Sequence, residues 1–366
     1  MKNLPLVLLL IIVSGLFFYM VNPQTKSLPS PSVATPTQKI KIANIPYWEQ
    51  EAGLASIKNH QGQFDFVSLF WYYLDDQGQI TNYQFADDNP KVVDDLKKSG
   101  TKVLVTLTNL PDKQGDWDPK RVGRVLGNPQ ATTAHIEDIL TLLREKYFDG
   151  VNIDYENLNS NQRESFSRFI ESLADKLHKQ GKVLQVSLHP KVGENKKEWQ
   201  NGSQAQDWIR LGKVTDQLVI MAFDQHSPGT NPGPIASVPW VENILNYALT
   251  LIPQDKIFLA LPLFGYDYTD GESVGFTLGQ IESLIKSTGV KTRTDSHQNP
   301  YFSYKKGEVI HKVWYEDKVS LQKKIDLVNS KNLGGVSIWH LGNEGEAIYH
   351  VLGGLTPTRA HPSSAR

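Results

Sequence analysis

Short apolar runs rich in β-branched residues alternate along most of this chain with longer segments whose apolar residues recur at helical spacing. The short runs predict eight strands: Ile40–Ile45, Phe66–Trp71, Lys102–Leu107, Gly150–Tyr155, Val183–Leu188, Gln217–Phe223, Lys256–Leu261 and Gly335–Trp339. Helical patterns fall between them, notably at Ala131–Lys146, Gln162–Gln180, Val238–Thr250 and Lys318–Asn329. This alternation indicates an α/β fold and favours a closed (β/α)8 TIM barrel of parallel strands. A doubly wound open sheet is the alternative, but no G-x-G-x-x-G pattern follows the first strand.

The segment after the seventh predicted strand, about residues 264–315, is too long for a simple loop. It contains strand-like pieces and a helical pattern near Leu278–Lys286. We therefore expect a small α+β insertion on the rim of the barrel.

The N-terminal residues predict export. An uncharged, mostly apolar run from Leu4 to Val21 is close to the roughly 20 residues that cross a bilayer as a helix. Lys2 favours an N-terminus that stays inside. Residues 1–21 therefore predict a membrane anchor or a signal segment. An anchor is favoured over a cleaved signal peptide because no A-x-A-like cleavage site precedes Ala34. In either case the rest of the chain is expected to be extracytoplasmic, held to the membrane through the N-terminal helix or secreted if that helix is cleaved.

The segments on either side of the barrel have a different composition. Residues 22–38 are rich in Pro, Ser, Thr and Gln, which predicts a flexible linker. Residues 354–366 are low in apolar content and predict a disordered tail. The folded unit is therefore expected at 39–353.

Composition narrows the possible partners. The 366 residues are 39% hydrophobic, which is ample for a large core, and the formal net charge of −1 does not favour nucleic acid as a partner. The chain has no Cys, which excludes disulfides, thiolate metal sites and cysteine catalysis. We expect a monomer.

Acidic side chains on the fourth predicted strand are the main candidates for chemistry. The stretch Asp149–Glu156 reads DGVNIDYE. Side chains two apart on a strand share one face, so Asn152, Asp154 and Glu156 are expected to project together. A buried carboxylate must be paired or neutralised, so such a group on an apolar strand favours catalysis, with helix capping or an ion pair as the alternative.

Residues at the carboxyl ends of barrel strands form the active site of this fold. The strand ends bring together aromatic, acidic and amide side chains. Carboxylates surrounded by Trp and Tyr suit a sugar, whose C–H faces stack on aromatic rings while its hydroxyls take hydrogen bonds. Besides the fourth strand, the candidate substrate-binding residues are Tyr47, Trp48, Trp71, Asn109, Met221, Phe223, Asp224, His226 and Trp339.

The histidines do not predict a metal site. The ten His residues are scattered along the chain, with no H-x-x-x-H spacing. We therefore expect no metal and no cofactor, which disfavours a metal-dependent deacetylase.

The strand-four stretch resembles the DxxDxDxE signature of glycoside hydrolase family 18, with Asn152 in place of the first Asp of the inner pair. Other segments resemble the branch of this family that contains spore-cortex-lytic N-acetylglucosaminidases and chitobiases. They are Met221–Asp224 (MAFD), Pro232–Ala236, Lys256–Tyr266, His311–Asp317 and Gly334–Trp339.

The resemblance implies a retaining glycosidase that is assisted by its substrate, for which the two-carboxylate scheme of most glycosidases does not hold. Glu156 would be the general acid and base, and Asp154 would orient the 2-acetamido group of an N-acetylglucosamine unit. Asn152 would hydrogen-bond Asp154 without adding a charge. Asp224 and Trp339 would line the subsite of the scissile sugar.

Three departures from the wider family accompany the resemblance. Asn152 and the absence of an SxGG segment on the third strand are both typical of the branch named above. Phe223 replaces a Tyr whose hydroxyl contacts the acetamido carbonyl in the family. A carbohydrate-binding protein without activity is therefore the alternative to an enzyme, although the presence of Glu156 favours an enzyme. Polysaccharides containing N-acetylglucosamine are the expected substrates, with peptidoglycan favoured over chitin oligosaccharides.

Overall fold

The computed structural model describes residues 38–112, 115–194 and 202–357. The predicted anchor at 1–21, all but the last residue of the linker and most of the C-terminal tail lie outside the described residues. Within the described ranges, no helix combines the length and the apolar character that crossing a bilayer requires.

Parallel strands close into a barrel, as the sequence predicts. The strand order is β1-β14-β8-β7-β6-β5-β4-β2, and β1 also pairs with β2, which completes the ring. The eight predicted strands are all present, with end points shifted by up to three residues: β1 Ile40–Pro46, β2 Phe66–Leu74, β4 Lys102–Thr108, β5 Gly150–Asp154, β6 Val183–Leu188, β7 Gln217–Ile220, β8 Ile257–Pro262 and β14 Gly335–Trp339. A short strand, β3 (Ile80–Asn82), pairs antiparallel with the end of β2.

Helices cover the outside of the barrel because each has one apolar face. In α5 (Arg163–Lys179), Phe166, Phe169, Ile170 and Leu173 are fully buried. Helix α4 (Pro129–Glu145) is capped by Asn128, whose side chain accepts a hydrogen bond from the backbone N–H of Ala131. The other helices of the barrel are α1 Gln50–Asn59, α2 Pro90–Lys98, α3 Pro119–Leu126, α6 Trp208–Val214, α7 Val238–Leu249, α9 Lys318–Ser330 and α10 Ala347–Leu352.

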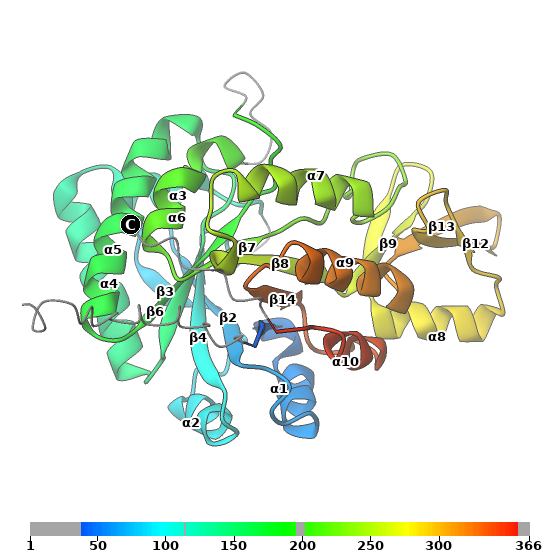
Figure 1. Cartoon of the computed structure of the whole chain (residues 1–366), viewed down its shortest axis with the longest axis horizontal. Coiled ribbons are helices and arrows are strands. Elements are labelled where there is room, and N and C mark those ends of the chain that lie inside the picture. Colours follow the sequence, from blue (N-terminus) through cyan, green and yellow to red (C-terminus); the bar gives the residue numbers. More distant parts are fainter. Residues whose placement is uncertain (1–37, 113–114, 195–201, 358–366) are drawn as a thin grey trace, which may run out of the picture. The chain divides into compact units, whose positions relative to one another are not determined.

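The predicted α+β insertion after the seventh barrel strand is confirmed. It is an antiparallel sheet of order β10-β9-β13-β12-β11 with one helix, seen at the right of Figure 1. Its elements are β9 Phe264–Tyr268, β10 Ser273–Thr277, α8 Leu278–Thr288, β11 Arg293–Thr294, β12 Pro300–Lys306 and β13 Val309–Tyr315.

A buried ion pair ties the end of this insertion to the barrel. Glu316 directly follows β13, and its carboxylate lies 2.7 Å from the Nζ of Lys324 on α9. The hydroxyl of Ser320 donates to the same carboxylate oxygen at 2.6 Å. Because both charges are buried, the attraction between them must offset the free energy that each loses on leaving water.

Candidate active site

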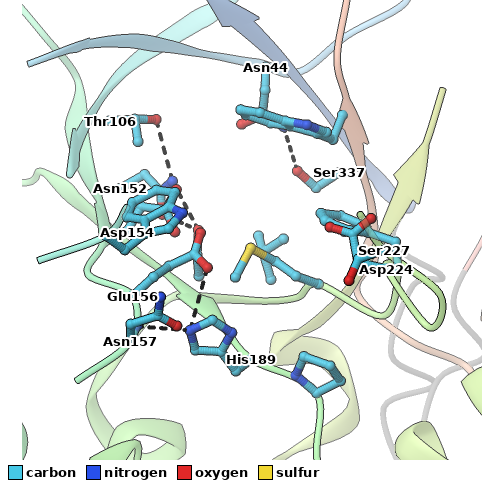
Figure 2. Close-up of a pocket in the computed structure, with 18 of the residues that line it drawn as sticks. Asn44, Thr106, Asn152, Asp154, Glu156, Asn157, His189, Asp224, Ser227 and Ser337 are labelled. Carbon is cyan, nitrogen blue, oxygen red and sulfur yellow. Dashed lines mark hydrogen bonds and ion pairs between the residues drawn. The ribbon is translucent and has the colours of Figure 1, made fainter. Parts of the chain in front are cut away.

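A cavity of about 530 Å³ opens at the carboxyl ends of the barrel strands. Figure 2 shows side chains from several strands converging on it, with the carboxylates of Asp154 and Glu156 on one side and that of Asp224 facing them. Of the predicted site residues, the cavity is lined by Asn152, Asp154, Glu156, Met221, Phe223, Asp224 and Trp339.

The alternation predicted for the fourth barrel strand holds. Asn152 and Asp154 on β5 face the cavity, and Glu156 still faces it although the strand ends at Asp154. On the other face, Val151, Ile153 and Tyr155 are buried. The hydroxyl of Tyr155 lies 2.7 Å from the Nε2 of His135 on α4, so this face is anchored to the surrounding helix layer.

Asn109 holds the backbone of Glu156 in place. Its side chain donates to the carbonyl oxygen of Glu156 at 2.9 Å and accepts from the Glu156 backbone N–H at 2.8 Å. Asn109 is fully buried at the end of β4 and does not line the cavity. The structure therefore places it behind Glu156, whereas the sequence suggested a contact with substrate.

We expect Asn109→Ala to lower kcat about 10-fold with little change in KM, because the freed backbone no longer fixes the carboxyl group of Glu156. Steady-state kinetics on chitin oligosaccharides would measure this, with thermal melting as the control for stability. An unchanged kcat in a folded variant would show that other contacts position Glu156.

Burial and mutual repulsion favour the protonated forms of the two acidic residues on this side. Burial raises the pKa of Glu156 well above its usual range, and the charges of Asp154, Asp224 and Asp116 raise it further. Burial also raises the pKa of Asp154. Two neighbouring carboxyl groups with raised pKa values share protons, so a proton is available on this pair near neutral pH.

The hydrogen bonds of Asn152 differ from the expected ones. Its amide nitrogen donates to the hydroxyl oxygens of Thr106 at 3.3 Å and Ser187 at 3.2 Å, on the two neighbouring strands, rather than to Asp154. The Oδ1 of Asp154 is buried and has no hydrogen-bond partner among the residues that the structure describes. A buried oxygen without a hydrogen-bond partner can accept a hydrogen bond from an N–H group of a ligand.

The opposite wall comes from the turn that follows β7. This strand was predicted to reach Phe223 but ends at Ile220, because the N–H groups of Ala222 and Phe223 bond to carbonyl oxygens only two residues back. Asp224 then adopts a positive φ of 58°. Its Oδ1 accepts a hydrogen bond of 2.8 Å from the hydroxyl of Tyr266, on β9 of the insertion.

A second cavity, of about 310 Å³, shares Phe223, Asp224 and Trp339 with the first. Its further lining includes Trp48, which is 48% exposed, and Phe264, Tyr266 and Phe276 from the insertion. The insertion therefore extends the aromatic surface beyond the carboxylates.

Besides Asn109, three predicted substrate contacts line neither cavity. Trp71 is fully buried and packs against Phe148 on the outside of β2, which corrects its predicted role. Tyr47 stacks on Tyr83 with ring centroids 4.4 Å apart. The Nδ1 of His226 lies 2.9 Å from the carbonyl oxygen of Asn231 in its own loop.

Several residues of the site were not predicted from the sequence. His189 follows the last residue of β6 and lines the first cavity, so the strand-end rule applied to β6 would have found it. Asp116, Trp117 and Trp240 also line that cavity, but they belong to a loop and a helix that the rule does not reach. Among the described residues, no three His, Asp or Glu side chains are grouped as a metal site would need.

Comparison with known proteins places most of the barrel in one family. The profile of "Glycosyl hydrolases family 18" matches residues 45–344. The "Uncharacterized glycosylase YvbX" of Bacillus subtilis is 29% identical over 306 residues, which is 82% of this chain and 87% of that protein. The "Cortical fragment-lytic enzyme" of Bacillus subtilis is 28% identical, over 67% of this chain and 58% of that protein.

Solved structures agree with these sequence relatives. A chitinase from Chromobacterium violaceum superposes with a TM-score of 0.78 and 26% identity, covering 90% of this chain and all (100%) of that one. The spore cortex-lytic enzyme SleL of Bacillus cereus has the same fold, with a TM-score of 0.79 at 22% identity over 89% of this chain and 76% of that one. The chain therefore belongs to glycoside hydrolase family 18 and is a glycosidase, similar to chitinases and cortex-lytic enzymes of that family.

Proposed function

We propose that this protein hydrolyses the β-1,4 bond that follows N-acetylglucosamine in peptidoglycan. The observation that carries the proposal is the pair of carboxyl groups that face the cavity from β5 and the residues directly after it: Asp154, which is buried, and Glu156, whose side chain is 16% exposed. A relative named as a cortical fragment-lytic enzyme favours a cell-wall substrate.

In the proposed reaction, Glu156 donates its proton to the leaving glycosidic oxygen. The acetamido carbonyl oxygen of the substrate attacks the anomeric carbon at the same time, so that an oxazolinium ion forms without a covalent bond to the protein. Water then attacks the anomeric carbon, and the carboxylate of Glu156 takes its proton. The raised pKa of Glu156 supports the acid role in the first step.

Asp154 would orient the acetamido group and stabilise the positive charge of the intermediate. The unpartnered Oδ1 of Asp154 is available to accept the acetamido N–H. Trp339 lines both cavities and would stack on the sugar between them, with Asp224 beside it. Trp48 and Phe276 in the second cavity would then bind sugars further along the chain.

The proposal includes the place of action. An anchor formed by residues 1–21 would hold the barrel outside the cytoplasmic membrane, where the linker at 22–38 would let it reach the wall. Fractionation of producing cells, with a protease applied from outside, would test this, because a barrel outside the membrane is degraded and one inside is protected.

The test of substrate is digestion of purified peptidoglycan and of chitin oligosaccharides, with the products read by mass spectrometry. Fragments of peptidoglycan with N-acetylglucosamine at their reducing ends are the expected products. Cleavage of chitin oligosaccharides alone would make the protein a chitinase-like enzyme of the same family. Binding without cleavage of either polymer would favour a lectin.

Phe223 is the residue that supports the alternative of a lectin without activity. It lines both cavities and lacks the hydroxyl of the Tyr that the family has at this position. We expect Phe223→Tyr to raise kcat on chitin oligosaccharides about 10-fold, because the added hydroxyl supplies a donor for the acetamido carbonyl oxygen. A stable variant with unchanged kcat would show that another group already supplies this hydrogen bond. The hydroxyl of Tyr266, 2.8 Å from Asp224, would then be the first group to remove.

A further inference from the structure

His189 lies against Glu156 but has no part in the reaction proposed above. It directly follows the last residue of β6, and its Nε2 is 3.4 Å from the Oε2 of Glu156 (Figure 2). The residue is only 6% exposed. A ring nitrogen this close to the carboxyl group must affect which protonation state that group prefers.

The backbone at His189 is held in place by a buried amide. The backbone N–H of His189 donates to the side-chain oxygen of Gln206 at 2.8 Å. The side-chain nitrogen of Gln206 in turn donates to the carbonyl oxygen of Ser187 at 3.1 Å. Gln206 is 1% exposed, and its two hydrogen bonds fix the backbone at the end of β6 from which the ring of His189 extends.

A second contact identifies the hydrogen-bonding role of the ring nitrogen. The backbone N–H of Asn157 donates to Nε2 of His189 at 3.3 Å. Nε2 is therefore an acceptor, and the hydrogen of the neutral ring is assigned to Nδ1. Burial lowers the pKa of His189 to about 3, so the ring stays neutral over the range in which Glu156 titrates.

A lone pair on Nε2 acts differently on the two forms of Glu156. It repels a carboxylate oxygen, whereas a carboxylic acid can donate to it, in a hydrogen bond shared with the Asn157 N–H that the same lone pair accepts. We propose that His189 is a positioning residue that keeps Glu156 in its acid form between turnovers by presenting an unprotonated ring nitrogen to Oε2. His189 itself neither gains nor loses a proton in the cycle. This inference rests on the proposed role of Glu156 as the general acid.

Other charged groups that face Glu156 act in the same direction. They are Asp154 on β5, Asp224 after β7 and Asp116 in the loop between β4 and α3, and each raises the pKa of Glu156 through its negative charge. The contribution of His189 must therefore be measured as a difference between proteins that keep all three.

The test is the pH dependence of kcat/KM for the full-length protein and its His189→Leu variant on chitin oligosaccharides. Leu keeps much of the ring's bulk and offers no lone pair. We expect the alkaline limb to move to lower pH by about half a unit to one unit. Activity would then fall about 3- to 10-fold on that limb and stay close to the unsubstituted protein at acid pH. His297→Leu, in the exposed loop before β12, is the matched control.

An equal loss of kcat/KM at every pH would overturn the inference, since loss of a purely structural role would not shift the alkaline limb of the pH profile. Should His189→Leu fail to fold, nitrogen NMR of the histidine-labelled protein provides a second test. We expect a ring that keeps Nδ1 protonated and Nε2 bare from about pH 5 to 8, and whose signals move in Glu156→Gln. A charged ring at neutral pH, or a hydrogen on Nε2, would overturn the inference. Failure of the proposed function is recognised separately, because Glu156→Gln would then remain active.

Discussion

Replacement of Glu156 by Gln is expected to lower kcat/KM on chitin oligosaccharides by about 10²–10⁴-fold, the range that general acid–base catalysis contributes. Gln has nearly the same shape, so the cavity and the hydrogen bonds of the Glu156 backbone to Asn109 are retained. What disappears is the proton for the leaving oxygen and the base for the attacking water.

The choice of substrate sharpens this experiment. A nitrophenyl glycoside releases a good leaving group that needs little protonation. The fall in kcat/KM caused by Glu156→Gln should therefore be smaller on this substrate than on an oligosaccharide. Glu145→Gln, at the exposed end of α4, controls for the change of residue type. Activity within 10-fold of the unsubstituted protein on oligosaccharides would refute Glu156 as the general acid.

Replacement of Asp154 by Asn is expected to lower kcat/KM by about 10²–10³-fold, by analogy with the loss of one group that stabilises charge in a buried site. The neutral amide cannot balance the positive charge of the oxazolinium ion. It can also turn its N–H₂ toward the acetamido group, where an acceptor is needed.

The same substitution carries a second, independent expectation for pH. The negative charge of Asp154 raises the pKa of Glu156, and Asn removes that charge. Glu156 should therefore lose its proton at lower pH, and the alkaline limb of the remaining activity should move in the acid direction. Asp138→Asn, on the exposed side of α4, is the control. A variant that loses activity while its alkaline limb stays in place would contradict the coupling of the two carboxyl groups.

A sugar substrate that lacks the acetyl group tests Asp154 without any substitution. If the acetamido oxygen is the nucleophile, fully de-N-acetylated oligosaccharides should bind without being cleaved. Their hydrolysis at a rate near that of the acetylated oligosaccharides would point to a protein nucleophile instead.

Strand and helix positions could be predicted because they follow from local periodicity. The barrel strands β6 and β14 begin and end at the residues that the sequence predicts. On β5, alternation was sufficient to place Asn152 and Asp154 together in the cavity, since side chains two apart share a face. The strand-end rule for barrels then brought Asp224 and Trp339 to the same site.

The local sequence pattern could not show which face of β2 points into the barrel and which points outward to the helices. The run from Phe70 to Tyr73 is aromatic throughout, so both faces look alike in the sequence. In the structure Phe70 lies under Trp48 and Trp339, while Trp71 packs outward against Phe148. The pairing of β2 with β4 also shifts register between Phe70 and Tyr72. Only the partner strands and helices decide such a choice.

The sequence by itself therefore determined the barrel, the insertion and the acidic pair of β5, because each follows from the pattern of residues that are close along the chain. The tertiary structure decided what surrounds that pair. Tyr266 meets Asp224 from the insertion, Asn109 reaches back from β4 to the Glu156 backbone, and His189 approaches Glu156 from β6. These contacts join residues more than 30 positions apart, as the separation of 33 between Glu156 and His189 shows. They form only when neighbouring barrel strands pair and the insertion packs on the barrel.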